Sequence, residues 1–198
     1  PMYMPRIKEK LIESFDNEKI FKFIHIPVQS GSDKVLNDMK RGHTAGTFRD
    51  IVQKIKERFS EFTISTDIIV GFPSETEEDF QKTVSLLDEI KPDVVNLSRY
   101  SARPGTDAAE LKQIDDAESK RRSKIVFEQI SKLSMESNKK WIGWKGKVLF
   151  DEKTDEGIKG RNFAYKPIAV NEPVELGQSY TVEITDATVK RLIGKIAS

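Results

Sequence analysis

The chain has 198 residues, 33 basic and 32 acidic, so its net charge of +1 provides no overall field that would attract nucleic acid. It contains no cysteine, which excludes disulfides, a thiol nucleophile and thiolate-bound metals or iron–sulfur clusters within these residues. No apolar run approaches the roughly 20 residues that a membrane-spanning helix needs, so we expect a cytoplasmic protein without membrane contact.

The chain opens with a predicted helix and a predicted strand. Ile7, Leu11 and Phe15 recur at helical spacing and predict a short amphipathic helix. Residues 21–28 (FKFIHIPV) have the composition of a strand that ends near its proline, and a polar QSGS loop follows. His25 inside this strand could be a ligand, but we favour a hydrogen-bonded core histidine.

Two long helices are predicted around a second strand. Residues 34–40 predict a short helix, and after a connector the first long helix carries one apolar face: Phe48, Ile51, Val52, Ile55 and Phe59. The second long helix has an inner side formed by Phe80, Val84, Leu87 and Ile90, and Pro92 ends it. Both helices should cover a sheet.

The stretch between these helices, STDIIVGFPSET (residues 65–76), is where we expect chemistry. The β-branched run 68–70 has no polar face, as in a strand of a parallel sheet that is covered on both sides. Ser74 and Glu77 have capping-box spacing at the helix start. Ligands bind at the carboxyl ends of parallel strands. Asp67 is a charged residue in an otherwise apolar strand, and a charge in such a place requires a partner.

A third strand is predicted at residues 93–100, so the pattern of strands and helices indicates an α/β fold with a parallel sheet. Three strands cannot close a barrel, and we favour a piece of a larger one. A long helix over residues 115–140 follows, with Asp115 and Glu118 at cap spacing. The basic run 120–122 is interpreted as a solvated face of this helix.

The last part of the chain predicts a small antiparallel β-barrel. Its strands are expected at residues 147–150, 157–161, 164–170, 179–185 and 192–196. The run 161–166 (RNFAYK) interleaves basic, amide and aromatic groups, a mixture that binds phosphates and stacks on bases. Phe163 and Tyr165 could equally face the barrel core, and the residues alone leave both interpretations open.

Four motifs resemble those of the radical S-adenosylmethionine methylthiotransferases, in the same order. They are HIPVQSGS (25–32), MKRGHT (39–44), STDIIVGFPSET (65–76) and YSARPGTDAA (100–109). The barrel that follows is similar to the RNA-binding TRAM domain of that family. Ser74 replaces the second glycine of GFPGET, and Ala102 replaces the proline of SPRPGT, which are mild departures.

The resemblance implies a fold and a set of cofactors. Residues 1–140, with the connecting helix 115–140, would be the C-terminal part of a radical SAM (β/α) barrel, and residues 141–198 an OB-like TRAM barrel. The full-length enzyme would bind S-adenosylmethionine and two 4Fe-4S clusters, and would receive electrons from a flavodoxin- or ferredoxin-like donor. The cluster ligands are not in this chain, so the fragment without its N-terminal half should be inactive.

The resemblance also implies an activity, the transfer of a methylthio group to C2 of a modified adenosine beside a tRNA anticodon. The RGHT and SARPGT motifs favour N6-threonylcarbamoyladenosine as that base. One alternative is a family member that modifies a ribosomal protein side chain. A second is a non-catalytic RNA-binding module, which upstream cysteines in the same protein would exclude.

Site residues follow from the same resemblance, with no catalytic residue and no metal ligand assigned. Residues expected in the S-adenosylmethionine pocket are Gln29, Ser30, Gly31, Ser32, Arg41, Asp67 and Gly71. The serine and glutamine side chains can form hydrogen bonds with the cofactor. Asp67 can accept a hydrogen bond from a ribose hydroxyl or an amino group of the cofactor, and an arginine can pair with its carboxylate. Residues expected to contact RNA are Arg99, Lys147, Arg161, Asn162, Tyr165, Lys166, Lys190 and Arg191.

Overall fold

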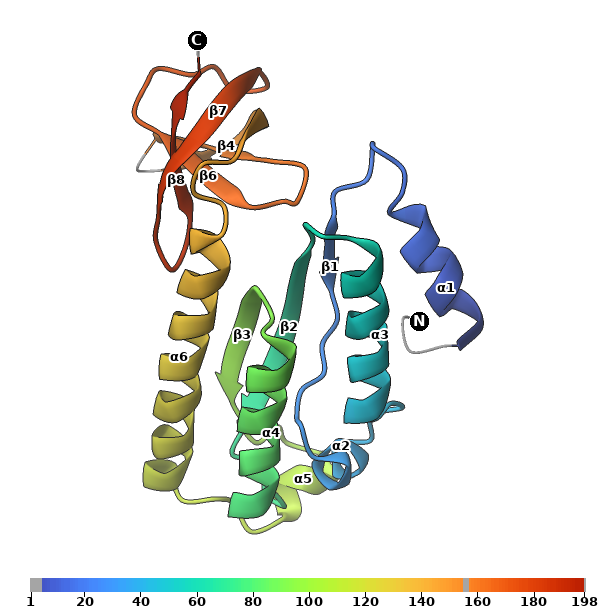
Figure 1. The fold of residues 1–198 in the computed structure, drawn as a ribbon. Helices are drawn as coiled ribbons and strands as arrows, with labels where there is room; N and C mark the ends of the chain where they lie inside the picture. Colours follow the sequence, from blue (N-terminus) through green and yellow to red (C-terminus); the bar gives the residue numbers. More distant parts are fainter. Residues whose placement is uncertain (1–4, 155–156, 198) are drawn as a thin grey trace.

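The computed structural model of the chain describes residues 5–154 and 157–197, and side chains from residue 8 onward. An α/β unit comes first and a closed five-stranded barrel second, and the long helix α6 (Asp116–Lys139) runs between them (Figure 1). The side chain of Ile7, expected on the inner face of the opening helix, lies outside the described part. No described helix is both long and apolar enough to cross a membrane.

The α/β unit is built on a parallel sheet in the order β1-β2-β3. Its strands are β1 (Phe23–His25), β2 (Thr63–Val70) and β3 (Val94–Arg99). Asp67 of β2 lies in register with Asn96 of β3. The prediction of an α/β fold with a parallel sheet is therefore confirmed.

Helices cover one face of this sheet and leave the other open (Figure 1). The covering helices are α3 (Ala45–Arg58), α4 (Glu77–Ile90) and α6, and the shorter helices are α1 (Pro5–Ser14), α2 (Asp33–Asp38) and α5 (Asp107–Glu110). Strand residues that point to the helices, such as Ile64 and Ile68, are buried, whereas His25, Asn96 and Ser98 on the opposite face are exposed. The open face is thus a polar surface.

Helix α4 begins later than the predicted cap. Thr76 Oγ1 accepts a hydrogen bond from the Asp79 N–H (3.2 Å), and the Asp79 carboxylate accepts one from the Thr76 N–H (3.2 Å), which completes a capping box. The predicted pair of Ser74 and Glu77 is wrong, because the Ser74 hydroxyl donates to Asp38 instead. The cap predicted at Asp115 is confirmed, since its carboxylate accepts from the Ala117 N–H (2.9 Å).

A buried ion pair ties α6 to the start of α4. Arg122 Nη1 lies 2.7 Å from Glu75 Oε2, and both side chains are almost completely buried. Burial raises the pKa of Glu75, against the opposing effects of the Gly71 N–H and of Arg122. The prediction that the basic run 120–122 is a solvated helix face is confirmed for Lys120 and Arg121, which are exposed. It is wrong for Arg122, whose side chain points inward and is buried.

The second unit is a barrel with strand order β4-β5-β6-β8-β7, closed by pairing of β7 with β4. The strands are β4 (Lys145–Thr154), β5 (Gly157–Arg161), β6 (Pro167–Val170), β7 (Ser179–Ala187) and β8 (Leu192–Ile196). The expected small antiparallel barrel is present, with one departure: β6 and β8 pair in parallel. Five strands of alternating direction cannot close a ring without one parallel pair.

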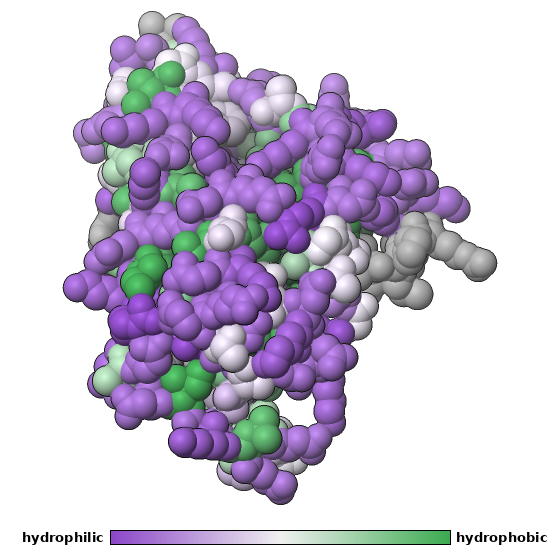
Figure 2. Space-filling model, turned by 60° about the horizontal axis from the view of Figure 1, so that its bottom comes forward, coloured by the Kyte–Doolittle hydropathy of each residue, from purple (hydrophilic) through white to green (hydrophobic). Residues whose placement is uncertain are grey.

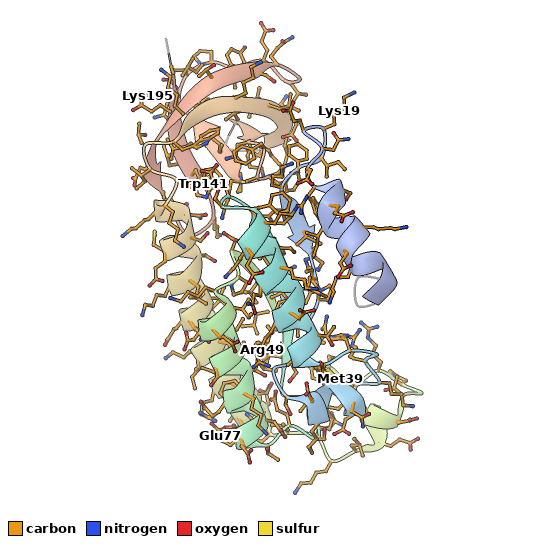
Figure 3. All side chains as sticks on the ribbon, turned by 45° about the vertical axis from the view of Figure 1, so that its right-hand side comes forward. Lys19, Met39, Arg49, Glu77, Trp141 and Lys195 are labelled. Atoms are coloured by element: carbon orange, nitrogen blue, oxygen red, sulfur yellow. The ribbon has the colours of Figure 1, made fainter. Side chains whose placement is uncertain are left out.

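The barrel is joined to the α/β unit by a buried lysine. Lys166 Nζ donates to Asp93 Oδ1 (2.9 Å), Ser137 Oγ (3.0 Å) and Asn138 Oδ1 (3.3 Å). Asp93 immediately precedes β3, so the barrel sits at the amino ends of the parallel strands. Figure 3 agrees, with Trp141 at the barrel and Met39 toward the opposite end of the molecule.

Candidate functional site

An open groove of about 900 Å³ lies at the carboxyl ends of β2 and β3. Its lining comes from the sheet, from the α2 region and from the loop after β3: Gln29, Asp38, Met39, Lys40, Arg41, Asp67, Ile68, Ile69, Phe72, Asn96, Ser98, Arg99, Tyr100, Ser101, Arg103, Gly105, Thr106, Asp107 and Ala108. Figure 2 turns this end of the molecule forward, and hydrophilic residues dominate it. This position and volume are typical of a ligand site in an α/β protein.

Asp67 is held on the open face of the sheet by its neighbours. Asn96 Nδ2 donates to Asp67 Oδ1 (3.0 Å), and His25 Nε2 lies 3.2 Å from Oδ2. The other ring nitrogen of His25 lies 2.9 Å from Ser65 Oγ. The side chain of Asp67 remains 30% exposed, so its carboxylate can accept a further hydrogen bond. His25 is hydrogen-bonded as expected, but it is not a core residue of this chain.

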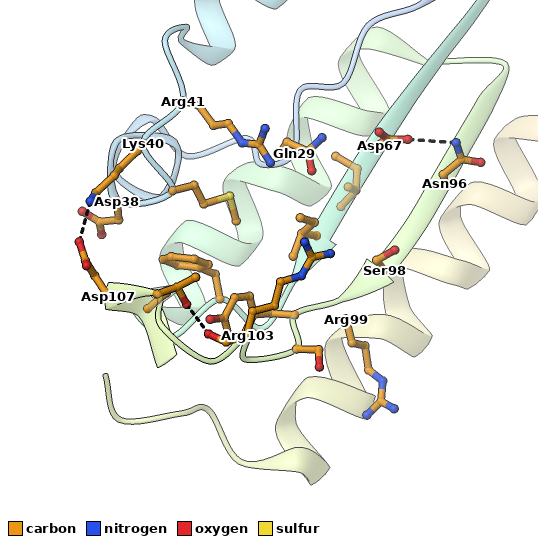
Figure 4. Close-up of a pocket in the computed structure, with 18 of the residues that line it drawn as sticks. Gln29, Asp38, Lys40, Arg41, Asp67, Asn96, Ser98, Arg99, Arg103 and Asp107 are labelled. Atoms are coloured by element: carbon orange, nitrogen blue, oxygen red, sulfur yellow. Dashed lines mark hydrogen bonds and ion pairs between the residues drawn. The ribbon is translucent and has the colours of Figure 1, made fainter. Parts of the chain in front are cut away.

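The groove carries positive charge at its rim. Arg41 and Arg103 line it, and neither guanidinium forms an ion pair within the part of the chain that the structure describes. Figure 4 shows Arg41 extending toward Gln29, whereas Arg99 points away from the other labelled side chains. Arg99 is paired with Asp116 of α6 (2.7 Å). The two unpaired guanidinium groups could bind an anionic group of a ligand.

Gln29 is placed in the groove by its backbone. Its N–H donates to the Asp67 carbonyl (2.9 Å), and its own carbonyl accepts from the Ile69 N–H (2.9 Å), so it continues the pairing of β1 with β2. Its φ of +76° is unusual for a residue other than glycine. Strained backbone of this kind clusters at ligand sites, and Gln29, Arg41 and Asp67 are the expected cofactor residues that the structure brings together.

The other expected cofactor residues lie elsewhere. Ser30 is fully buried with its hydroxyl 3.3 Å from Thr83 Oγ1 of α4, and Ser32 caps α2 and donates to Asp79 (2.6 Å). Gly31 and Gly71 do not line the groove, since Gly31 packs on the backbone of α4 and Gly71 against Ser119 of α6. These four residues shape the loops around the groove and do not face it.

The run 161–166 is mostly unavailable to RNA in this arrangement. Lys166 is 2% exposed and is held at the joint described above, and Asn162 is 1% exposed because its side chain closes a turn with the Ala164 and Lys166 N–H groups. Arg161 pairs with Glu152 (2.6 Å). The Tyr165 ring packs against Phe21 and Phe23 at 5.0 Å. The structure therefore contradicts RNA contact by Asn162 and Lys166, because both side chains are consumed in packing.

The remaining expected RNA residues lie on the barrel surface or near the groove. Lys147 and Lys190 are exposed, Arg191 is half-buried, and Arg99 lies in the groove wall. Sequence reasoning missed Asn96 and Ser98 as groove residues. Their signal was the alternation in residues 93–100, where every second side chain faces the same side of the sheet as Asp67.

The described residues provide no centre for a metal or cluster. No group of three or more histidine, cysteine, aspartate or glutamate side chains in them could hold a metal ion. The sequence has no cysteine at all. An iron–sulfur cluster therefore does not fit these residues.

Comparison with known proteins relates part of the chain to a family. Residues 1–87 match the model of the radical SAM superfamily. This match covers less than half of the chain, and it agrees with the resemblance inferred from the motifs at residues 25–76.

The chain is also similar over nearly its whole length to proteins named probable threonylcarbamoyladenosine tRNA methylthiotransferase. The identity is 43% to the protein of Archaeoglobus fulgidus, with 100% of this chain and 46% of the relative covered. The identity to the protein of Methanocaldococcus jannaschii is 46%, with 96% of this chain and 43% of the relative covered. A tRNA-2-methylthio-N(6)-dimethylallyladenosine synthase of Magnetococcus marinus is 35% identical, with 96% of this chain and 45% of the relative covered. The chain thus spans about half the length of these curated relatives.

Proposed function

We propose that the chain is part of a radical SAM methylthiotransferase that adds a methylthio group to C2 of N6-threonylcarbamoyladenosine in tRNA. The names of its most similar relatives support the substrate. The observation that carries the proposal is the position of Asp67, an accessible carboxylate fixed by two neighbours at the carboxyl end of a parallel strand. Mass spectrometry of tRNA from a strain that lacks the gene would identify the base.

The groove residues fit S-adenosylmethionine. Asp67 can accept from a ribose hydroxyl or an amino group, and Arg41 or Arg103 can pair with a carboxylate. Ile69 and the ring pair of Phe72 and Tyr100, 5.1 Å apart, offer apolar contact for an adenine. The bound cofactor would supply the radical chemistry, and these residues would hold and orient it.

The cluster ligands and the electron donor belong to the whole protein. Because these residues cannot hold an iron–sulfur cluster, we infer that both 4Fe-4S clusters are bound by cysteines elsewhere in the full-length chain. The electron donor would be a flavodoxin- or ferredoxin-like protein. On this proposal, residues 1–140 are the C-terminal part of the radical SAM domain, and catalysis needs the rest of the protein.

The barrel is proposed to be a TRAM domain of OB-like type that contacts the RNA, over residues 141–198. Its order β4-β5-β6-β8-β7 with one parallel pair supports this, since OB folds are five-stranded barrels that bind oligonucleotides. The relatives reported above are named for tRNA modification, which favours a tRNA substrate over a ribosomal protein. Cysteines elsewhere in the full-length protein would exclude the non-catalytic module.

The proposal predicts that Asp67→Asn in the full-length protein weakens S-adenosylmethionine binding. Loss of a charged hydrogen-bond acceptor should lower the affinity about tenfold to hundredfold. Isothermal titration calorimetry measures this effect. The matched control is Asp107→Asn, which removes an exposed carboxylate at the groove rim and should change the affinity little. Equal affinities for wild type and Asp67→Asn, with the fold intact, would refute the assignment.

A further inference from the structure

The open face of the parallel sheet carries a histidine that does not line the groove. His25 is the last residue of β1, and its side chain is 36% exposed on the same face as Asp67 and Asn96. The ring is not among the residues that form the groove wall. Any role of His25 in ligand binding must therefore act through a neighbour that does line the groove.

The imidazole ring of His25 bridges two side chains of the neighbouring strand. Its Nδ1 lies 2.9 Å from Ser65 Oγ, and its Nε2 lies 3.2 Å from Asp67 Oδ2. Ser65 and Asp67 are alternate residues of β2, so their side chains point to the same face of the sheet. One flat ring from β1 thus contacts two successive side chains on the open face of β2.

The partners of the ring determine which nitrogen carries a hydrogen. A carboxylate only accepts hydrogen bonds, so Nε2 of His25 must donate to Asp67. In the neutral ring Nδ1 then accepts from the Ser65 hydroxyl, and in the protonated ring Nδ1 donates to it. Both forms keep a donor on Nε2, so the contact with Asp67 does not depend on the charge of the ring.

Ser65 is suited to hold the ring because it is itself buried. The residue is 3% exposed, and a buried hydroxyl requires a hydrogen-bond partner. Nδ1 of His25 supplies one. This bond fixes the rotation of the ring and leaves Nε2 directed at Asp67.

Asp67 is held from both neighbouring strands. His25 of β1 approaches Oδ2, and Asn96 of β3 donates to Oδ1 (3.0 Å), a contact drawn in Figure 4. Two donors on different oxygens fix the rotation of the carboxyl group, whereas one donor would leave it free to turn. A side chain that is already ordered loses less conformational entropy when a ligand binds to it.

We propose that His25 is a positioning residue, with Ser65 as its anchor, and that it orients the Asp67 carboxylate for S-adenosylmethionine. This inference rests on the proposed function, since it assumes that Asp67 contacts this cofactor. Binding sites generally need such support, because the residues that contact a ligand are held in place by the hydrogen bonds of residues behind them. The competing role is purely structural, in which the hydrogen bonds of His25 stabilise only the sheet.

Two amide substitutions of His25 separate the roles of its ring nitrogens. The glutamine amide reaches about as far from the backbone as Nε2, so His25→Gln keeps a donor for Asp67. The asparagine amide reaches only about as far as Nδ1, so His25→Asn keeps the contact with Ser65 and loses the one with Asp67. In the full-length protein, isothermal titration calorimetry should find that His25→Gln binds S-adenosylmethionine within about threefold of wild type and His25→Asn about tenfold more weakly. Equal affinities of the two variants would overturn the inference.

A double-mutant cycle tests whether His25 acts through Asp67. His25→Leu alone should weaken S-adenosylmethionine binding about tenfold, but in the Asp67→Ala background it should change the affinity by less than about twofold, because no carboxylate remains to be oriented. An equal loss in both backgrounds would show a purely structural histidine and overturn the inference. Gln53→Leu is the control, because Gln53 donates to Glu57 on the exposed side of α3, lies outside the groove and should not affect the affinity.

The variant Ser65→Ala tests the anchor. It removes the hydroxyl beside Nδ1 of His25, so the ring is held on one side only and binding should weaken about threefold. In the His25→Leu background the same change should have no effect. A loss of equal size in both backgrounds would show that Ser65 does not act through the ring, which would overturn its part of the proposal.

The outcomes separate this inference from the proposed function. If Asp67→Ala binds S-adenosylmethionine as tightly as wild type, the cofactor contact of Asp67 is wrong and the inference fails with it. If Asp67→Ala binds weakly but His25→Leu binds like wild type, only the inference is wrong. Circular dichroism checks the fold of each variant. If His25→Leu does not fold, the two amide variants decide, because each keeps one hydrogen bond of the ring.

Discussion

Asp79 shows at the residue scale how one buried carboxylate organises the loops around the groove. Its oxygens accept hydrogen bonds from the hydroxyl of Ser32 (2.6 Å) and from the hydroxyl and N–H of Thr76 (2.9 and 3.2 Å). Burial alone would raise its pKa, but these hydrogen bonds outweigh that effect and lower the pKa of Asp79 to about 2. The same side chain therefore caps α4 and anchors the cap of α2.

The depressed pKa of Asp79 predicts a pH dependence of stability. The unfolded carboxyl binds a proton near pH 3.8 and the folded one only near pH 2, so its contribution is complete above pH 4 and is lost as the pH falls toward 2. The loss should be about 2 kcal/mol of unfolding free energy. Urea unfolding between pH 6 and pH 2 measures it. Asp79→Asn should be less stable at pH 6, and the difference from wild type should shrink on acidification; a constant difference would contradict this account.

At the scale of elements, the loop after β1 and helix α4 approach each other so closely that only glycine fits. A Cβ atom at Gly31 would lie 2.3 Å from the Lys82 carbonyl oxygen and 2.6 Å from the Thr83 Cα. Both are backbone atoms and cannot rotate away. The Gly31 N–H also donates to Thr83 Oγ1 (2.9 Å), so the contact is a hydrogen-bonded junction. Through it α4 supports the loop that presents Gln29 to the groove.

This junction predicts that Gly31→Ala destabilises the protein. The added methyl group must push the loop from α4, and overpacking of this kind costs about 1–3 kcal/mol. Gly42→Ala is the control, because nothing lies within 4 Å of the corresponding Cβ position, and it should change the stability by less than about 0.5 kcal/mol. Thermal unfolding of both variants is the measurement. Similar melting temperatures for the two would mean that the close approach does not exist in solution.

At the scale of the whole molecule, the polar cluster around Lys166 couples the two units. Asp93 accepts from Lys166 Nζ, and its other carboxylate oxygen accepts from the Ile64 N–H of β2 (2.9 Å). Asn138 of α6 binds Lys166 and also donates to the Thr188 carbonyl of the β7–β8 turn (2.8 Å). The sheet, the long helix and the barrel thus meet at one buried ammonium group, which holds the barrel in a fixed orientation.

Removal of this ammonium should uncouple the units. Lys166→Met leaves Asp93 without its buried partner, at a cost of about 3–5 kcal/mol, and the barrel should then unfold separately from the α/β unit. In the 198-residue chain, fluorescence reports the barrel end, where both tryptophans lie, and far-ultraviolet circular dichroism reports mainly the helices. The two signals should coincide in wild type and in the exposed-lysine control Lys190→Met. Coincident transitions in Lys166→Met as well would show that other contacts carry the coupling.

The sequence by itself determined the elements of this protein and the order of its parts. Apolar periodicity identified the covering helices, the β-branched run of β2 indicated a parallel sheet, and the polar residue Asp67 marked the strand end that forms the groove. The ordered motifs at residues 25–76 indicated the superfamily whose model matches residues 1–87. These features are local, because each depends on the spacing of residues along a single strand, helix or turn.

Only the tertiary structure decided which polar residues face a ligand. Ser30, Ser32 and Lys166 have the composition of binding residues, but each points into a contact with an element 28 to 73 positions away in sequence. Asn96 lies in the groove because the parallel pairing of β2 with β3 places it beside Asp67. The physical reason is that a polar group binds whichever partner the fold places within about 3 Å, and that partner is set by chain packing between distant segments.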